Sequence, residues 1–297
     1  MTGLYSLIRR NSKLFFRDKG VFFTSLITPM ILLVLYATFL AKVYRDSFMS
    51  GIPAEFAVPD KIIDGIVGGQ LVSSLLAVSC VTVAFCSNMI MVQDKQKGVR
   101  RDLMLSPVKP STLALGYYVA TELTTLLVCL VAFGAGLIYM AATGFYMSAA
   151  DIALTLLDIL LLTLFGTALS SVINHFLSTQ GQISAVGSIV SSCYGFICGA
   201  YMPISQFGEG LRAVLGFLPG TYGTSLFRNH TMRGAMNELL ELGVPREVID
   251  SLRDVVDCNV YCLDKQVSEP VMFAVLAGSM VLLIAVYVLL VRFSKKK

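Results

Sequence analysis

Residues 65–93 read GIVGGQLVSSLLAVSCVTVAFCSNMIMVQ and contain no Asp, Glu, Lys or Arg. A helix needs about 20 consecutive apolar residues to cross the hydrocarbon core of a bilayer, and this stretch is longer. It also lacks the two-residue alternation that is typical of a membrane β-strand. The stretch therefore predicts a membrane-spanning helix.

The rest of the chain has the same character, with 56% hydrophobic and only 14% charged residues. A soluble domain carries roughly 25% charged residues. In lipid, every backbone polar group must be paired within the protein, which leaves helices or a closed barrel. We therefore expect an all-α polytopic membrane protein in which 1–297 form a single transmembrane domain. The charge-poor stretches predict six spans, close to 21–41, 65–93, 110–142, 152–173, 183–202 and 271–291.

Basic residues predict the orientation of these spans, because Lys and Arg near span ends remain in the cytoplasm. They gather before the first span, between the second and third, and after the last, where they make up 14 of the 23 Lys and Arg residues. Six spans with both termini in the cytoplasm satisfy this pattern, and residues 203–270 are then external. The apolar run after Lys19 exceeds the 7 to 15 residues of the hydrophobic region of a typical signal peptide, so we interpret it as a retained anchor in the cell membrane.

Two segments on the predicted cytoplasmic side have recognisable patterns. Residues 1–19 include an amphipathic stretch with apolar and basic faces at helical spacing, which predicts a helix lying on the membrane surface. A basic flank without fixed geometry is the alternative. The charged loop 93–111 predicts a short helix from Val99 to Leu105 that ends before Pro107, because a residue preceding proline avoids the helical conformation. An ordinary solvated connector is the alternative there.

The fifth predicted span carries small residues at four-residue spacing: Gly187, Ser191, Gly195 and Gly199. Such a stripe lets another helix approach closely. The spacing predicts tight packing, and it leaves open whether the neighbour is the same chain or a second copy.

The predicted external segment 203–270 begins with a short apolar stretch between Pro203 and Pro219, too short to cross the membrane. It predicts a re-entrant helix dipping back from the outer face. Residues 235–256 alternate acids with aliphatic residues around Pro245, which predicts two short amphipathic helices that form a cap. Cys258 and Cys262 are then external, either as free thiols or as a disulfide.

Residues 199–228 read GAYMPISQFGEGLRAVLGFLPGTYGTSLFR. This segment, together with the predicted order of elements, resembles the type-2 ABC export permease family. Gly208-Glu209 departs from the Leu-Pro that such permeases often carry. The external insert from Gly234 to Ser268 is long and is similar to that of the drug-resistance and antibiotic-export subgroup.

The resemblance implies a dimer of two identical or closely related permeases, driven by two ATPase subunits that bind ATP and Mg²⁺. It implies that the N-terminal helix and residues 94–106 contact those ATPases, and that spans one, two and five line the path between protomers. In the loop, charges from Arg100, Arg101 and Asp102 would pair with the ATPase. Leu103, Met104 and Leu105 would supply apolar anchors of the kind that dominate interfaces.

The chain itself shows no pattern for catalysis. It has no Gly-Lys-Ser or Gly-Lys-Thr of a phosphate-binding loop, and no catalytic residue is assigned. Its two histidines, His175 and His230, are far apart in sequence and do not indicate a metal site. We expect no cofactor in this chain, no nucleic-acid partner, and membrane lipid as its surroundings.

Glu122 and Asp158 are acids inside predicted spans, which makes them candidates for a substrate path. One interpretation is a cation-preferring route for an amphiphilic substrate. The other is a structural role, with each acid protonated or hydrogen-bonded to nearby hydroxyl groups such as those of Thr121 or Thr155.

The predicted function is outward transport of a hydrophobic or amphiphilic substrate, whether drug, lipid, peptide or glycan. A secondary transporter is an alternative, although no internal repeat is visible. A membrane-embedded lipid-modifying enzyme is the other alternative.

Overall fold

The computed structural model describes residues 2–53, 56, 58–106, 108–262 and 265–293. Pro107 and the basic residues Lys295–Lys297 of the sequence patterns lie outside this part. The first eight elements in chain order are α1 (Thr2–Arg17), α2 (Lys19–Leu35), the π-helical turn η1 (Tyr36–Leu40), α3 (Ala41–Gly51), α4 (Asp60–Ser87), α5 (Met89–Gln96), α6 (Val99–Leu105) and α7 (Pro110–Thr143). They are followed by α8 (Ala149–Phe176), α9 (Gln180–Ile197), the 3-10 turn η2 (Ile204–Gln206), α10 (Glu209–Leu215), α11 (Pro219–Glu241), α12 (Arg246–Val255), β1 (Val260–Cys262), β2 (Lys265–Val267) and α13 (Glu269–Phe293).

Five helical stretches in the described part are long and apolar enough to cross a membrane. They are Lys19–Gly51, Asp60–Gln96, Pro110–Thr143, Ala149–Phe176 and Glu269–Phe293. They confirm the predicted all-α polytopic class. The fifth predicted span corresponds to α9, which has 18 residues and carries two glutamines in its first turn. Helix α9 is not among the five, and its crossing stays a prediction.

Helix α4 forms the centre of the fold, since nearly all of its residues from Ile62 to Ser87 are buried. Helices α2, α7, α8, α9 and α11 pack around it. Glycines bring two of these neighbours close. A Cβ on Gly69 would lie 2.9 Å from the Thr231 carbonyl oxygen of α11, and one on Gly166 of α8 would lie 2.8 Å from the Cys80 carbonyl oxygen. Thr231 Oγ1 also donates a hydrogen bond to the Gly69 carbonyl group at 3.0 Å, so α11 is bonded directly to α4.

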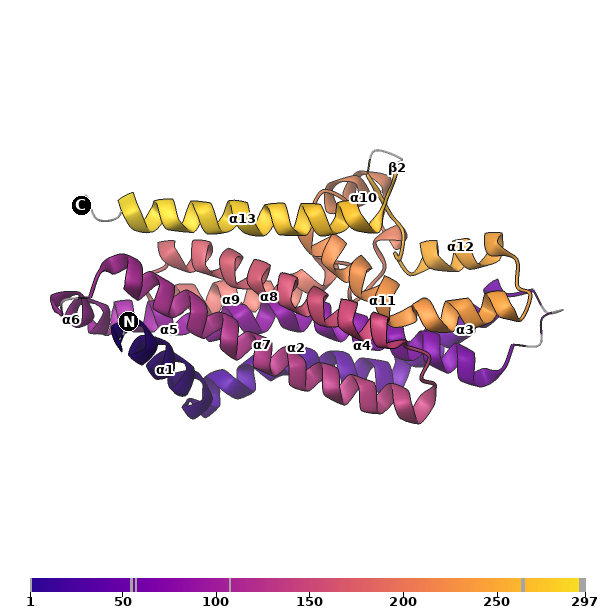
Figure 1. Ribbon diagram of the computed structural model, residues 1–297, viewed down its shortest axis with the longest axis horizontal. Coiled ribbons are helices and arrows are strands. Elements are labelled where there is room, and N and C mark those ends of the chain that lie inside the picture. Colours follow the sequence, from indigo (N-terminus) through magenta and orange to yellow (C-terminus); the bar gives the residue numbers. More distant parts are fainter. Residues whose placement is uncertain (1, 54–55, 57, 107, 263–264, 294–297) are drawn as a thin grey trace.

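The long helices run roughly parallel to one another along the longest axis of the molecule (Figure 1). Helices α1 and α6 and the C-terminal end of α13 lie at one end, on the left of the view. Helices α3 and α12 lie at the opposite end. The segments that carry the basic residues of the sequence pattern therefore share one end of the protein.

Helix α11 corrects the prediction for residues 235–256. No new helix begins at Ala235, because α11 runs without interruption from Pro219 to Glu241. Its polar stretch around Arg228 and His230 is buried against other helices, so the pattern of apolar residues did not reveal its length. The predicted break at Pro245 is present, and α12 begins directly after it.

Two further differences concern the segment predicted to be external and the helix that precedes it. Strands β1 and β2 form an antiparallel hairpin in which Val260 pairs with Val267; strands of three residues leave little signal in a sequence. Helix α9 ends at Ile197, short of the predicted 202, because Gly199 adopts the left-handed conformation that terminates helices, with φ of 77°. The surface position of α1 and the re-entrant path through α10 stay predictions.

Candidate functional site

A groove of about 930 Å³ lies between α2 and α9. Its floor is formed by Cys86 of α4 and by Met89 and Gln93 of α5. Ile27 and Ile31 on the α2 side are exposed, so the groove opens along the side of the protein. The spans that the resemblance assigns to a path, namely the first, second and fifth, are the ones that enclose it.

The two walls of this groove differ in chemistry. Helix α2 contributes an apolar wall that includes Ile27, Ile31 and Leu35, while α9 contributes the hydroxyl groups of Ser184, Ser188, Ser191 and Ser192. Ligand sites combine a mostly apolar lining with a few polar groups that orient the ligand. The groove is therefore suited to an amphiphilic molecule, or to the face of another helix.

The small-residue stripe of α9 contacts other parts of the same chain. A Cβ on Gly187 would lie 3.0 Å from Met89 Cε of α5. A Cβ on Gly195 would lie 2.4 Å from the ring of Tyr201, whose hydroxyl group donates a hydrogen bond to the Ser191 carbonyl oxygen at 3.4 Å. At Gly187 and Gly195, the stripe therefore serves packing within the chain.

Gly199 corrects the prediction that four small residues share one helix face. It lies beyond the end of α9 and has a positive φ. Its carbonyl group accepts a hydrogen bond of 2.6 Å from Arg228 Nη2 of α11. Gly199 thus ends the helix and aims a backbone acceptor at a buried guanidinium group.

At the opposite end of the bundle, Asp94 of α5 joins three helices. Arg10 of α1 binds its carboxylate with both guanidinium nitrogens, Nη1 to Oδ2 at 2.6 Å and Nη2 to Oδ1 at 2.9 Å. Tyr117 of α7 donates a third hydrogen bond at 2.7 Å. The hydrogen bond to Asp94 raises the pKa of Arg10 above its usual value. Bidentate arginine–carboxylate pairs fix geometry, so α1 is held firmly on the bundle.

Helix α6 follows this junction and matches the predicted helix from Val99 to Leu105. It begins after Gly98, whose φ is 77°, and it ends where Ser106 turns to extended backbone. Leu103 is half-buried and packs against the core formed by α1, α5 and α7. Met104 is 50% exposed and Leu105 is 82% exposed. Arg101 and Asp102 are exposed as well, and Arg100 is half-buried.

Glu122 lies on α7 and is buried against α8. The hydroxyl groups of Thr163 and Thr167 donate hydrogen bonds to its two carboxylate oxygens at 2.8 and 2.9 Å. The expectation that residues of its own helix, such as Thr121, would serve as partners was wrong. Both actual partners lie across the helix interface, where two threonines one helical turn apart face the same carboxylate.

Asp158 of α8 is fully buried and lies against a histidine of α11. His230 Nδ1 is 2.5 Å from Asp158 Oδ2, whereas Thr155 bonds to the backbone of Asp151 instead. Neither Asp158 nor Glu122 is among the residues that line the groove between α2 and α9. The structure thus brings neither acid to that groove, and each one joins two helices.

His230 and Arg233 are functional candidates that the sequence reasoning missed. Arg233 Nη1 lies 3.3 Å from Asp151 of α8, and Arg233 Nη2 lies 3.0 Å from Glu269 of α13. His230 Nε2 is 3.8 Å from the same carboxylate of Glu269. His230 and Arg233 lie one turn apart on α11, whereas the acids that they face, Asp158 and Asp151, lie two turns apart on α8. Because the two spacings differ, the sequence carries no signal for this pairing. In the described part, no group of three or more His, Cys, Asp and Glu side chains is arranged to hold a metal ion.

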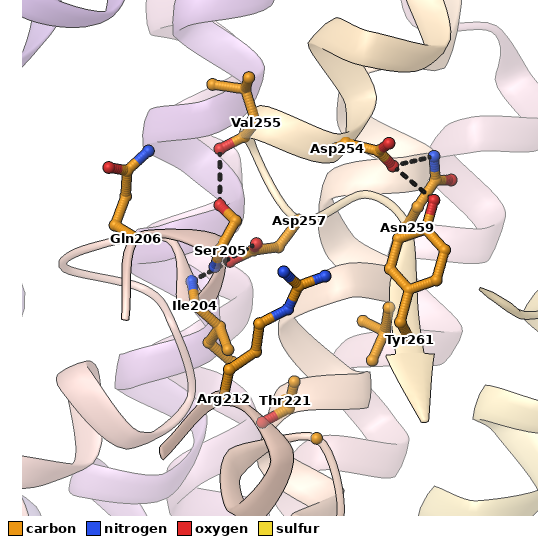
Figure 2. A pocket seen from close by; sticks show the side chains of 12 residues that line it. Ile204, Ser205, Gln206, Arg212, Thr221, Asp254, Val255, Asp257, Asn259 and Tyr261 are labelled. Carbon is orange, nitrogen blue, oxygen red and sulfur yellow. Dashed lines mark hydrogen bonds between the residues drawn. The ribbon is translucent and has the colours of Figure 1, made fainter. Parts of the chain in front are cut away.

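A pocket of about 330 Å³ lies between η2, α10, α12 and the hairpin (Figure 2). Asp257, at a left-handed φ of 52°, accepts hydrogen bonds from the backbone N–H groups of Ile204 and Ser205. Arg228 Nη1 lies 3.3 Å from the same carboxylate. These contacts anchor the loop that follows α9 to the loop that follows α12, and Figure 2 shows Asp257 pointing at this junction.

Cys258 and Cys262 are free thiols in the structure. Cys258 is buried beneath α12, and burial raises the pKa of its thiol to about 12. Cys262 is half-exposed on β1. The two cysteines therefore differ in access to reagents.

The family model described as "ABC-2 type transporter" matches residues 2–231. The chain belongs to the ABC-2 type transporter family. The match covers α1 to the middle of α11, and it includes the groove, the Asp94 junction and α6. A search of curated proteins finds no match. ABC-2 permeases are membrane subunits of transporters and are generally not enzymes themselves.

Proposed function

We propose that this ABC-2 permease is the membrane subunit of an ATP-driven exporter in the cell membrane, with both termini in the cytoplasm. It pairs with a second copy or a related permease, and ATP and Mg²⁺ are bound by a separate ATPase subunit. The substrate is a hydrophobic or amphiphilic molecule, and the subgroup of drug and antibiotic exporters is the first to test.

The observation that carries this proposal is the way in which α6 packs on the bundle. Leu103 is packed into the bundle, while Met104 and Leu105 are presented at the end where α1 and the C-terminal end of α13 lie. A short helix with a packed base transmits force, and its exposed apolar side chains supply contact energy at an interface. The Asp94 junction holds α1 beside it, so both predicted contacts with an ATPase lie at one end.

The groove between α2 and α9 supports the second part of the proposal. A second permease that faces this groove would turn its apolar and hydroxyl walls into half of an enclosed path. Movement of α6 reaches the floor of the groove along α5, which packs against α6.

The experiment is reconstitution of the full chain in vesicles with a candidate ABC ATPase subunit from the same genome. We expect substrate-stimulated ATP hydrolysis by the complex and loss of that stimulation in Leu105→Asp. Normal stimulation in Leu105→Asp, with correct insertion, would place the contact elsewhere, most plausibly on α1.

Secondary transport is the second candidate, favoured by one observation. Asp158, His230 and Glu269 form a chain of titratable groups across three helices, and such groups within a bundle are typical of proton-coupled carriers. Vesicles that contain the permease without ATPase and carry a pH gradient distinguish the two. Substrate accumulation in those vesicles would support the carrier, and accumulation only with ATPase and ATP would support the exporter.

A further inference from the structure

A second groove, of about 480 Å³, lies between α7 and α13 at the end that carries α6. Its lining residues come from the first turns of α7 and the last turns of α13, and the floor is formed by Tyr118 and Tyr287. It is separate from the groove between α2 and α9, and neither the proposed path nor the proposed ATPase contact uses it.

The floor of this groove is apolar although both residues are tyrosines. Their rings stack, with centroids 6.5 Å apart. The Tyr118 hydroxyl group donates a hydrogen bond to the Leu164 carbonyl oxygen at 3.2 Å, and the Tyr287 hydroxyl group lies 3.7 Å from Met91 Sδ. Because both hydroxyl groups bond inward, the stacked rings form the base of the groove.

The walls and the mouth differ in polarity. Leu115, Ile284 and Val288 make the walls apolar, whereas Ser111 and Arg292 lie at the mouth. Arg292 is exposed in the last turn of α13, and the described residues that line the groove include no acid. In the sequence, Lys109 immediately precedes α7. The mouth is therefore complementary to a negative charge.

The depth of the groove fits one leaflet. From Arg292 to Ile284, a helix advances about 12 Å at about 1.5 Å per residue. Half of a hydrocarbon core of about 30 Å is about 15 Å. A molecule with a negative head at Arg292 and a hydrocarbon tail along the stacked rings thus has the shape of a lipid.

We propose that this groove binds one anionic phospholipid of the leaflet at the α6 end. The phosphate lies against the Arg292 guanidinium group and the Ser111 hydroxyl group, and an acyl chain lies over Tyr118 and Tyr287. Basic pockets between helices on the cytoplasmic side bind anionic head groups in this way. Assignment to the cytoplasmic leaflet rests on the proposed orientation, whereas the site itself does not.

The bound lipid would also stabilise the surface against which α6 packs. A small cavity on the inner side is lined by Arg100 and Met104 of α6 together with Ala114, Tyr287 and Val291. The last three residues also line the lipid groove. A lipid that orders Tyr287 and Val291 therefore orders the surface on which α6 rests, and its relevance to energy coupling rests on the proposed function.

The test measures lipid binding to the purified full chain by native mass spectrometry, with phosphatidylglycerol and phosphatidylethanolamine of identical acyl chains. We expect preferential retention of phosphatidylglycerol. Arg292→Gln should weaken it about fivefold, the effect of one basic residue near a lipid head group, and Arg292→Lys should preserve it.

A matched pair of variants on α13 tests the acyl part of the site. Val288→Trp fills the groove, while Val281→Trp places the same bulk two turns away; Val288 and Val281 are 56% and 58% exposed, so both substitutions should be tolerated by the fold. We expect loss of the bound lipid in Val288→Trp alone. Equal retention of lipid in all variants would show that only surrounding bilayer lipid is bound, and it would overturn the site. Equal binding of phosphatidylglycerol and phosphatidylethanolamine would overturn it as well. So would displacement of the bound lipid by a transport substrate.

A second measurement tests the link to α6 without any ATPase. Hydrogen exchange of residues 99–105 should slow in nanodiscs that contain phosphatidylglycerol, and it should not slow in Val288→Trp. Unchanged exchange in the presence of bound lipid would overturn the effect on α6 and leave the binding site standing.

Discussion

His230 of α11 lies against Asp158 of α8, with Nδ1 2.5 Å from Oδ2 and both side chains withdrawn from the surface. The contact joins two helices that also pack on α4. Glu269 of α13 lies on the other side of the imidazole ring. One histidine thus connects α8, α11 and α13.

His230→Ala should destabilise the permease strongly, because it leaves the Asp158 carboxylate buried without its partner. Loss of one partner of a buried pair costs about 3 to 5 kcal/mol. The measurement is thermal unfolding of the purified protein in detergent. The double variant His230→Ala with Asp158→Ala should recover part of the loss, and identical melting of wild type and His230→Ala would show that the contact carries no stability.

Glu122→Gln should reduce transport of cationic and neutral amphiphiles to the same degree. Glu122 joins α7 to α8 through Thr163 and Thr167 and does not line the groove between α2 and α9, so its charge should not select substrates. Export assays with a matched cationic and neutral pair check this. A loss of transport confined to the cationic substrate would indicate that Glu122 belongs to the substrate path.

On α6, Leu105→Asp should abolish substrate-stimulated ATPase activity without affecting assembly, since Leu105 is exposed. Leu103→Asp should abolish it too, with a lower melting temperature, because Leu103 packs into the bundle. Arg101→Ala should cost little, since exposed ion pairs contribute about 0 to 1 kcal/mol. Melting curves measured alongside ATPase assays distinguish the three variants. A loss of stimulated ATPase activity in Arg101→Ala as large as that in Leu105→Asp would contradict an apolar contact with the ATPase.

Gly195→Ala should destabilise α9, because its Cβ would lie 2.4 Å from the ring of Tyr201. Gly134→Ala on α7 is the control, since a Cβ there meets nothing within 4 Å. Adding Tyr201→Ala to Gly195→Ala should relieve the clash. If instead Gly195→Ala only weakens association of two permeases and leaves the melting temperature unchanged, the stripe serves a second copy.

Cys262 should react with a membrane-impermeant maleimide in intact cells, and Cys258 should not, at neutral pH. A thiol with a pKa of about 12 remains protonated there, and only the thiolate is an effective nucleophile. Mass spectrometry of the labelled peptide reads out both positions. Labelling of Cys258 at the rate of Cys262 would indicate that the segment covering Cys258 opens. Protection of both thiols, with a protein mass lower by two hydrogens, would indicate a disulfide between them.

The sequence predicted the bounds of helices well where lipid solvation or backbone conformation determines them. The predicted stretch 110–142 nearly coincides with α7, and α6 has its predicted bounds, because charge and proline leave few alternatives. Sequence reasoning failed where polar groups find partners across helices. Arg228 and His230 fall in the segment predicted to be external, and no sequence pattern indicated that Gly199 and Asp158 pair with them in the interior. Such pairing depends on distant segments, and no local periodicity reports it.

The central place of α4 has a consequence for how the chain is made. It is synthesised early, with Gln70, Ser74 and Thr82 along it, and all three are buried in the finished protein. Helix α11, which covers Gly69, leaves the ribosome much later. Until then, α2, α7, α8 and α9 can pack on α4, but the face at Gly69 lacks its partner, so a chain truncated before Pro219 should be degraded. Maturation of the permease is thus completed by roughly its last quarter.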